Sequence, residues 1–273
     1  MPEGPEAASI VSFIHDEFVG KELSHVQILK GRYINHGPPV YYNDFINALP
    51  LKLLRVDKKG KVIFLYFTNN WCIISKLGMT GWWYSTNKPD WRTEVKTVTF
   101  DFTSSRTSQQ LIYSDPRSYG TLTFTQDTQR VIDELQQLAP DIMDPSTTYK
   151  IFDIRVQRLI QNKPHTPIEE LLSDQKLLIC GIGNYLKSEI LYACKIAPMR
   201  HIIDITPNEW NHIYKTSKKI SAYMLKALAS KKMDAYISKM YVYSKKQDPL
   251  GNPIKTYSNK LGRTVHWVSE VQK

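Results

Sequence analysis

The chain has 273 residues, a formal net charge of +10 at pH 7 and 42% hydrophobic residues. This length favours two domains, and apolar runs of only a few residues exclude a membrane-spanning helix. The N-terminus lacks the basic start and the apolar stretch of a secretory signal. Cys72, Cys180 and Cys194 are isolated and no CxxC pair occurs, so we expect buried thiols in a reducing, intracellular compartment and no cysteine-bound zinc. Nucleus and cytoplasm both remain open.

The excess positive charge lies in the second half of the chain. Residues 1–150 contain 16 Lys and Arg against 16 Asp and Glu, whereas residues 151–273 contain 20 against 10. This asymmetry favours a polyanionic partner, most simply a nucleic acid. A solvated basic surface is the alternative that charge alone leaves open.

The chain begins with Met1-Pro2-Glu3-Gly4-Pro5-Glu6. Removal of Met1 would leave Pro2 with a free secondary amine. An α-amino group titrates at about pH 7.7–8, so a useful fraction is neutral near pH 7. That amine can condense with an aldehyde-level carbon to form an iminium, with Glu3 beside it as a general acid. Apolar residues at near-helical spacing over 7–19 predict a helix that positions this end; a disordered, inert terminus is the alternative.

Short alternating segments follow this helix and predict an antiparallel β-sandwich or barrel. The expected strands are residues 23–29, 51–56, 61–67, 71–77, 95–102, 110–113 and 121–124, with a short helix over 42–49. From residue 127 the hydrophobic period becomes helical, and the expected helices are 127–138, 149–161, 168–172, 184–195 and 208–229. Residues 139–148 contain two prolines and are the expected linker between domains 1–138 and 149–273.

The last part of the chain returns to short alternating segments. They cover residues 237–243 and 254–267 and predict a hairpin-like arrangement around Asp248-Pro249-Leu250-Gly251-Asn252. Earlier in the same half, Gly181-Ile182-Gly183-Asn184 lies between two expected helices. Glycines let backbone amides approach a ligand, and the following helix N-terminus suits a phosphate. A glycine-rich packing turn is the alternative.

Four motifs follow one another in an order typical of a known family. They are MPEGPE at residues 1–6, LGMTG at 77–81, DPRSYG at 115–120 and the unit from Asp174-Gln175 to Asn184. Over nearly its whole length the chain resembles the formamidopyrimidine/endonuclease VIII (Fpg/Nei) family of DNA glycosylases. The resemblance implies an α+β protein in which an N-terminal helix and an antiparallel β-sandwich precede a helix-two-turn-helix domain with a C-terminal β-hairpin finger.

The resemblance also implies roles for particular residues. Pro2 would attack C1′ of a damaged nucleotide and displace the base, while Glu3 assists opening of the sugar ring. Lys61 matches the family lysine near the scissile phosphate that transfers a proton in β-elimination; an exposed strand-end lysine is the alternative. The residues implied to fill the gap left by the extruded base are Met79, Arg117 and Tyr119. The family more often has Phe in place of Tyr119 and Arg in place of Ser118.

The finger, about residues 238–273, departs from most bacterial members, which carry four zinc-binding cysteines. Residues 240–273 contain no cysteine and one histidine, His266. This resembles the zincless finger of the endonuclease VIII-like 1 subgroup, so no metal and no cofactor are expected. Packing of Tyr257 and Trp267 would hold the hairpin. Arg263 would grip the phosphate beside the lesion and aid δ-elimination; a solvent-facing hairpin residue is the alternative.

Lys76, Lys163 and Asn184 are further candidates for phosphate contacts. The expected partner is double-stranded DNA with an oxidised base or an abasic site, bound by a monomer. Gly4 is typical of the Nei branch, and the interval after residue 229 lacks a long loop that would cap 8-oxoguanine, so oxidised pyrimidines and hydantoins are favoured. An enzyme preferring 8-oxoguanine or formamidopyrimidine, a non-catalytic DNA-binding protein and an RNA-binding helix-two-turn-helix module are the alternatives.

Overall fold

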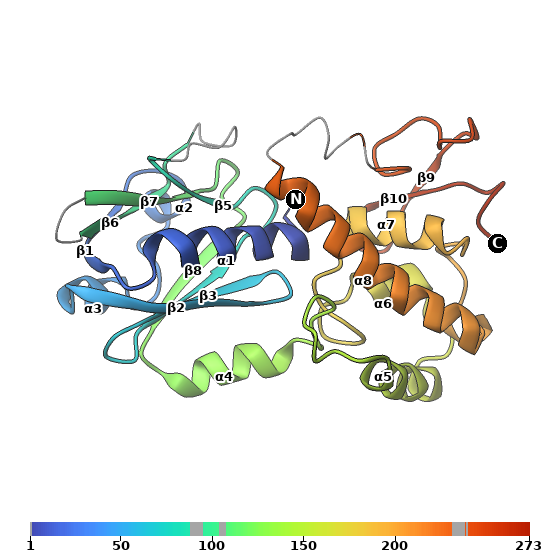
Figure 1. Cartoon of the computed structure of the whole chain (residues 1–273), viewed down its shortest axis with the longest axis horizontal. Coiled ribbons are helices and arrows are strands. Elements are labelled where there is room, and N and C mark those ends of the chain that lie inside the picture. The colour runs from blue at the N-terminus through green and yellow to red at the C-terminus, as the bar shows by residue number, and fades with distance from the viewer. Residues whose placement is uncertain (1, 88–94, 104–107, 231–237, 239) are drawn as a thin grey trace. The chain divides into compact units, whose positions relative to one another are not determined.

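The computed structural model describes residues 2–87, 95–103, 108–230, 238 and 240–273. It separates into two compact units, drawn in Figure 1. The first contains Pro2 and Glu6–Gln136, and the second contains Gln137–Lys273 together with Glu3–Pro5. Near the start of the chain the boundary between the two units therefore falls between Pro2, which belongs to the first unit, and Glu3, which belongs to the second.

The first unit is built on an antiparallel sheet in which the described strands run in the order β5-β7-β6-β1-β2-β3-β4-β8. The strands are β1 Glu22–Ile28, β2 Leu51–Lys59, β3 Val62–Phe67, β4 Cys72–Lys76, β5 Trp82–Ser85, β6 Val98–Thr103, β7 Ser108–Ser114 and β8 Thr121–Thr125. The helices are α1 Gly4–Phe18, α2 Arg32–Asn35, α3 Tyr42–Asn47 and α4 Thr128–Gln137.

This sheet folds into two layers. The pairing between β1 and β2 has only two register pairs, Glu22 with Lys52 and Leu23 with Leu51. Trp83 Nε1 on β5 donates to Ser75 Oγ on β4 at 3.0 Å, although several strands separate β5 and β4 in the sheet order. A direct bond between distant strands requires the two halves to face each other, so the predicted antiparallel sandwich is confirmed.

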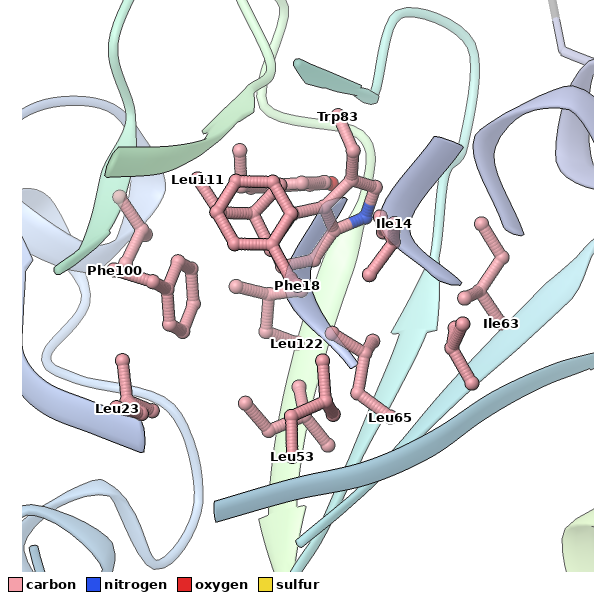
Figure 2. Packing of buried hydrophobic residues seen from close by; sticks show 14 of the residues in the cluster. Ile14, Phe18, Leu23, Leu53, Ile63, Leu65, Trp83, Phe100, Leu111 and Leu122 are labelled. Carbon is pink, nitrogen blue, oxygen red and sulfur yellow. The ribbon is translucent and has the colours of Figure 1, made fainter. Parts of the chain in front are cut away.

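The core of the first unit is filled from α1. Ala7, Ile10, Ile14 and Phe18 recur at helical spacing and are at most 2% exposed. The Phe18 ring lies 5.0 Å from that of Phe102. Figure 2 shows the α1 side chains of Ile14 and Phe18 among Leu23, Leu53, Leu65, Phe100, Leu111 and Leu122 from the strands. The predicted N-terminal helix is therefore present, and burial of its apolar face fixes it to the sheet.

The second unit is mainly helical and has its own core. It contains α5 Tyr149–Asn162, α6 Ile168–Ser173, α7 Asn184–Ala193, the 3-10 helix η1 Ile202–Asp204, α8 Pro207–Ala229 and the hairpin β9 Lys255–Ser258 with β10 Thr264–Trp267. Phe152, Leu171, Leu186, Ile190 and Trp210 are among its buried residues. The α+β fold with a helical second part and a terminal hairpin is confirmed.

Three details differ from the sequence prediction. Strand β5 was not predicted because Trp82, Trp83, Tyr84 and Ser85 are all buried and show no alternation. Helix α2 has only four residues, which is too short for a periodic signal. The hairpin reverses at residues 259–263, whereas Asp248–Asn252 forms a separate turn closed by a bridge between Gln247 and Pro253.

The expected strand at 237–243 is absent from its described final part. Residues 237 and 239 lie outside the described residues, and residues 240–243 form no strand. Instead the backbone N–H groups of Tyr241, Val242 and Tyr243 donate to the Glu189 carboxylate at 2.7–2.9 Å. A buried carboxylate of α7 thus takes the hydrogen bonds that a neighbouring strand would otherwise have received.

A capping network at the start of α8 makes stability depend on acid pH. Thr206 and Glu209 form a capping box, and Glu209 receives both guanidinium arms of Arg200 at 2.7 and 3.0 Å. The Arg200 hydrogen bonds hold the pKa of Glu209 at about 2, against an ordinary 4.5. Because the pKa of Glu209 is depressed in the folded protein, this stabilisation is present above pH 4.5 and disappears as pH falls toward 2.

We expect the difference in Tm between wild type and Glu209→Gln to be largest above pH 5 and to shrink below pH 3. Thermal unfolding followed by circular dichroism measures it, and a pH-independent difference would contradict the prediction.

Among the described residues no helix is long and apolar enough to cross a membrane.

Candidate active site

The Glu3 side chain is fixed at the N-terminus of α7. Its carboxylate is fully buried and accepts three backbone N–H bonds: from Gly183 at 2.6 Å, from Tyr185 at 2.9 Å and from Leu186 at 3.2 Å. The first N–H groups of a helix have no partner within the helix and carry its positive dipole end. Glu3 therefore caps α7 from more than 180 residues away in sequence, and the N-terminal segment is held rather than frayed.

The backbone next to Glu3 is held by the turn that precedes α7. Gly4 N–H donates to the Gly181 carbonyl at 2.8 Å, and Gly181 has a φ of +100°, which favours glycine. A Cβ on Gly4 would lie 3.1 Å from the Gly181 oxygen, so the two glycines allow this close approach. Gln175 orders the turn, because its side chain accepts from Gly181 N–H at 2.9 Å and donates to the Ile182 carbonyl at 2.7 Å.

Asn184 links α7 to the hairpin. It is the first residue of α7 and is 8% exposed, and its Nδ2 donates to the Thr264 carbonyl of β10 at 2.8 Å. Arg263, the residue before Thr264, is exposed. Within the second unit the structure thus brings the predicted Glu3, Asn184 and Arg263 to one end of α7.

The hairpin is held mainly by β-branched side chains. Val265 and Val268 are at most 1% exposed, whereas the predicted packing residues Tyr257 and Trp267 are only partly buried. Burial and the nearby carboxylates of Glu169 and Glu170 raise the pKa of Tyr257 strongly. In the described residues no group of three or more His, Cys, Asp and Glu could hold a metal ion, and Cys72, Cys180 and Cys194 are buried.

In the first unit, the loop of residues 77–81 lies against the loop of residues 115–120. The buried Asp115 carboxylate accepts from Thr80 Oγ1 and from Gly120 N–H, both at 2.6 Å. Arg117 N–H in turn donates to Thr80 Oγ1 at 3.3 Å. The DPRSYG motif contains Asp115, but the motif alone does not predict that Asp115 joins the two loops, although an Asp-Pro pair is a known turn initiator.

The two joined loops carry the three predicted void-filling residues. Met79 and Tyr119 are 43% and 55% exposed. The Arg117 guanidinium carbon lies 4.9 Å from the Tyr119 ring centroid, in cation–π range. A thioether, a guanidinium and a ring are thereby presented from one loop pair.

Crowding at Gly120 gives a test of this loop pair. A Cβ there would overlap the Tyr113 hydroxyl oxygen and lie 2.9 Å from the Lys76 carbonyl oxygen. Gly120→Ala is therefore expected to lower the free energy of unfolding of the first unit by about 1–3 kcal/mol, the usual cost of overpacking. Urea denaturation of the variant beside wild type measures it. An unchanged midpoint would show that the loops tolerate the displacement.

The other predicted cations occupy separate positions. Lys61 lies in the turn between β2 and β3, directly after Gly60, whose φ is +58°. Lys76, at the end of β4, donates to Glu134 Oε1 at 2.7 Å in an ion pair that a phosphate would have to compete with. Lys163 is exposed at the C-terminal end of α5.

Sequence reasoning did not identify a buried ion pair at the base of the hairpin. Lys187 Nζ on α7 lies 2.6 Å from Glu169 Oε2 on α6, and their side chains are 0% and 2% exposed. Burial lowers the pKa of the Lys187 ammonium, although Glu169 acts in the opposite direction. No local signal marks it, because a lysine followed by Ser188 and Glu189 in a helix has the pattern of an exposed polar position.

Comparison with known proteins matches the first unit to a family model. Residues 1–122 match the formamidopyrimidine-DNA glycosylase N-terminal domain. The formamidopyrimidine-DNA glycosylase of Ureaplasma parvum is 28% identical over 83% of this chain and 79% of its own length. The protein of the same name from Listeria innocua is 26% identical, with full coverage of both chains.

Solved structures share the fold at lower identity. A structure of MutM in complex with DNA containing carbocyclic 8-oxo-G has a TM-score of 0.80 and 20% identity, with full coverage of both chains. The Lactococcus lactis formamidopyrimidine-DNA glycosylase, bound non-covalently to DNA containing an AP site, has a TM-score of 0.79 and 20% identity over 99% of each chain.

The fold joins an N-terminal helix and an antiparallel sandwich to a helical unit with a terminal hairpin, and the sequence has Pro-Glu directly after Met1. The match of residues 1–122 to the family model and the relatives that cover the chain at full length support the Fpg/Nei family of DNA glycosylases.

Proposed function

We propose that this protein is a bifunctional DNA glycosylase and abasic-site lyase that excises oxidised bases from double-stranded DNA as a monomer. The observation that carries the proposal is the held N-terminal end: the Glu3 carboxylate receives three N–H bonds from the start of α7. A terminal amine next to an anchored residue has a restricted position, which nucleophilic catalysis requires. The names of the relatives support the glycosylase part of this proposal.

The glycosylase step uses the first two residues of the processed chain. After loss of Met1, the Pro2 nitrogen attacks C1′ of the damaged nucleotide and the bond from C1′ to the base breaks, with the electron pair leaving on the base. The proton of the Pro2 nitrogen passes to the Glu3 carboxylate, which delivers it to O4′ as the bond between C1′ and O4′ breaks, and the nitrogen lone pair forms the iminium with C1′. The departing base takes up a proton from water. The anchored carboxylate of Glu3 keeps this proton transfer within reach of the sugar.

Two eliminations then cut the strand. Loss of the C2′ proton breaks the bond from C3′ to its oxygen, and Lys61 is the proposed proton carrier. Loss of the C4′ proton breaks the bond from C5′ to its oxygen and leaves a 3′-phosphate, and Arg263 is proposed to stabilise the charge on that phosphate. Water hydrolyses the remaining iminium and frees Pro2.

The loop pair of the first unit is proposed to occupy the space vacated by the extruded base. Met79 would act as an apolar wedge, Arg117 would bond the orphaned base and Tyr119 would stack beside it. Asn184, Lys163 and Lys76 are proposed phosphate contacts. Since Lys76 is paired with Glu134, its contribution requires exchange of that partner.

For the lesion we propose oxidised pyrimidines and hydantoins, on the basis of Gly4 and of the short interval before the finger, which we propose is a zincless finger. The relatives' names favour formamidopyrimidine as the alternative substrate. Single-turnover excision of thymine glycol, guanidinohydantoin, 8-oxoguanine and formamidopyrimidine from one duplex sequence distinguishes them. Faster excision of the two purine lesions would favour the alternative.

Borohydride trapping tests the reaction class. Hydride reduction of the iminium carbon would leave a stable covalent complex between Pro2 and abasic-site DNA. We expect trapping by protein whose loss of Met1 is confirmed by mass spectrometry, and at least a hundredfold less by protein with an N-terminal extension that blocks the Pro2 nitrogen. Both forms keep the same folded residues, so circular dichroism should agree between them. Absence of trapping by the processed form would contradict the proposal and favour a non-catalytic DNA-binding protein.

A further inference from the structure

One side chain closes the hairpin turn that carries Arg263. Asn259 Oδ1 accepts from Leu261 N–H at 3.0 Å and from Arg263 N–H at 2.9 Å, while Asn259 N–H donates to the Arg263 carbonyl at 3.0 Å. The backbone of Arg263 is thus bound on both sides by the same residue. The sequence Asn-Lys-Leu-Gly has the composition of such a turn.

The other end of the Asn259 amide is anchored outside the turn. Its Nδ2 donates to Glu169 Oε2 at 3.2 Å, and the same oxygen receives Lys187 Nζ at 2.6 Å. Because Oδ1 is committed to two backbone donors and Nδ2 to a carboxylate, only one orientation of the amide satisfies all its partners. The turn is therefore fastened to α6 and α7 through a buried charge pair.

A second contact from the same turn is an exposed ion pair and does not reach the buried charge pair. Lys260 Nζ lies 3.2 Å from Glu170 Oε1, but the Lys260 side chain is 79% exposed. An exposed ion pair is screened by solvent and restrains its side chains weakly. The part-buried contact of Asn259 with the buried Glu169 is thus the one that sets the geometry of the turn.

We propose that Asn259, held by the Glu169–Lys187 pair, is the positioning residue that aims Arg263 at the DNA phosphate and so controls the second elimination. This inference rests on the proposed function, because it concerns the step in which the bond from C5′ to its oxygen breaks. A guanidinium aligned with the departing phosphate oxygens lowers the barrier of that step. Base removal and the first elimination depend on other residues.

Asn259→Asp is the discriminating variant. It keeps both acceptor contacts to the turn but replaces the donor to Glu169 by a carboxylate, so two negative charges face each other. We expect the ratio of 3′-phosphate ends to 3′-unsaturated-aldehyde ends to fall about tenfold, equivalent to one charge-assisted hydrogen bond, with base excision unchanged. Denaturing gels under single-turnover conditions resolve the two ends.

Adding Glu169→Gln to Asn259→Asp provides the rescue. The introduced amide can accept from Lys187 and donate to the introduced carboxylate, so the contact is restored with its polarity reversed, and the ratio should return to within about threefold of wild type. Lys260→Gln, in the same turn, should leave the ratio unchanged.

An unchanged ratio in Asn259→Asp, or an equal loss of base excision and of the ratio, would overturn the inference. Wild-type protein that excised no base and cut no strand would overturn the proposed function and this inference together. A wild type that yields both ends separates the two cases.

Discussion

Glu3→Gln is expected to slow excision of an oxidised base by about 10²–10⁴-fold, the range that general acid catalysis supplies. The amide cannot deliver a proton to O4′, and it has one acceptor oxygen where the carboxylate offers two to the N–H groups of Gly183, Tyr185 and Leu186. Part of the effect therefore comes from lost chemistry and part from a loosened N-terminal end.

An abasic substrate separates these parts. Its C1′ is already in equilibrium with an open aldehyde, so ring opening needs no acid and only the position of Pro2 matters. We expect the loss on abasic DNA to be at least tenfold smaller than on thymine glycol DNA. Single-turnover rates on the two duplexes measure this, with Glu22→Gln on the exposed face of β1 as the control variant. Equal losses on both substrates would show that Glu3 acts only as an anchor.

The sequence predicts the elements whose periodicity is strong. α1, α5, α7 and α8 carry apolar residues at helical spacing, and most strands of the sandwich alternate or have turn residues beside them. It fails where pattern is absent, as at β5, whose residues are buried on both faces. The hairpin turn was misplaced because both Asp248–Asn252 and Asn259–Arg263 have turn composition, and only pairing between β9 and β10 distinguishes them.

The candidate residues are identifiable from local motifs, but the residues that hold them in place by hydrogen bonds and ion pairs are not. Glu3 accepts a hydrogen bond from Gly183, which is 180 residues away in the sequence. Asp115 likewise joins two loops that lie far apart in the sequence. A lysine in a helix is normally exposed, so nothing local predicts that Lys187 is buried against Glu169. Such long-range polar contacts arise only when the whole unit is packed.

Lys187→Met is expected to destabilise the second unit strongly. Among the described residues it leaves the buried Glu169 carboxylate with the Asn259 amide as its remaining side-chain partner, and removal of one member of a buried pair costs about 3–5 kcal/mol. Urea denaturation followed at 222 nm measures the free energy of unfolding. Because the hairpin turn is fastened through the same carboxylate, the variant should also show lower hydrogen-exchange protection at Arg263 N–H.

The double variant Lys187→Met with Glu169→Gln decides whether unpaired charge is the cause. It removes both charges, while the introduced amide oxygen still accepts from Asn259 Nδ2, so most of the lost stability should return even though a second residue has changed. The exposed pair gives the matched control, since Lys260→Met should cost no more than about 1 kcal/mol. A double variant as unstable as Lys187→Met would mean that packing of the lysine stem, rather than its charge pairing with Glu169, holds α6, α7 and the finger turn together.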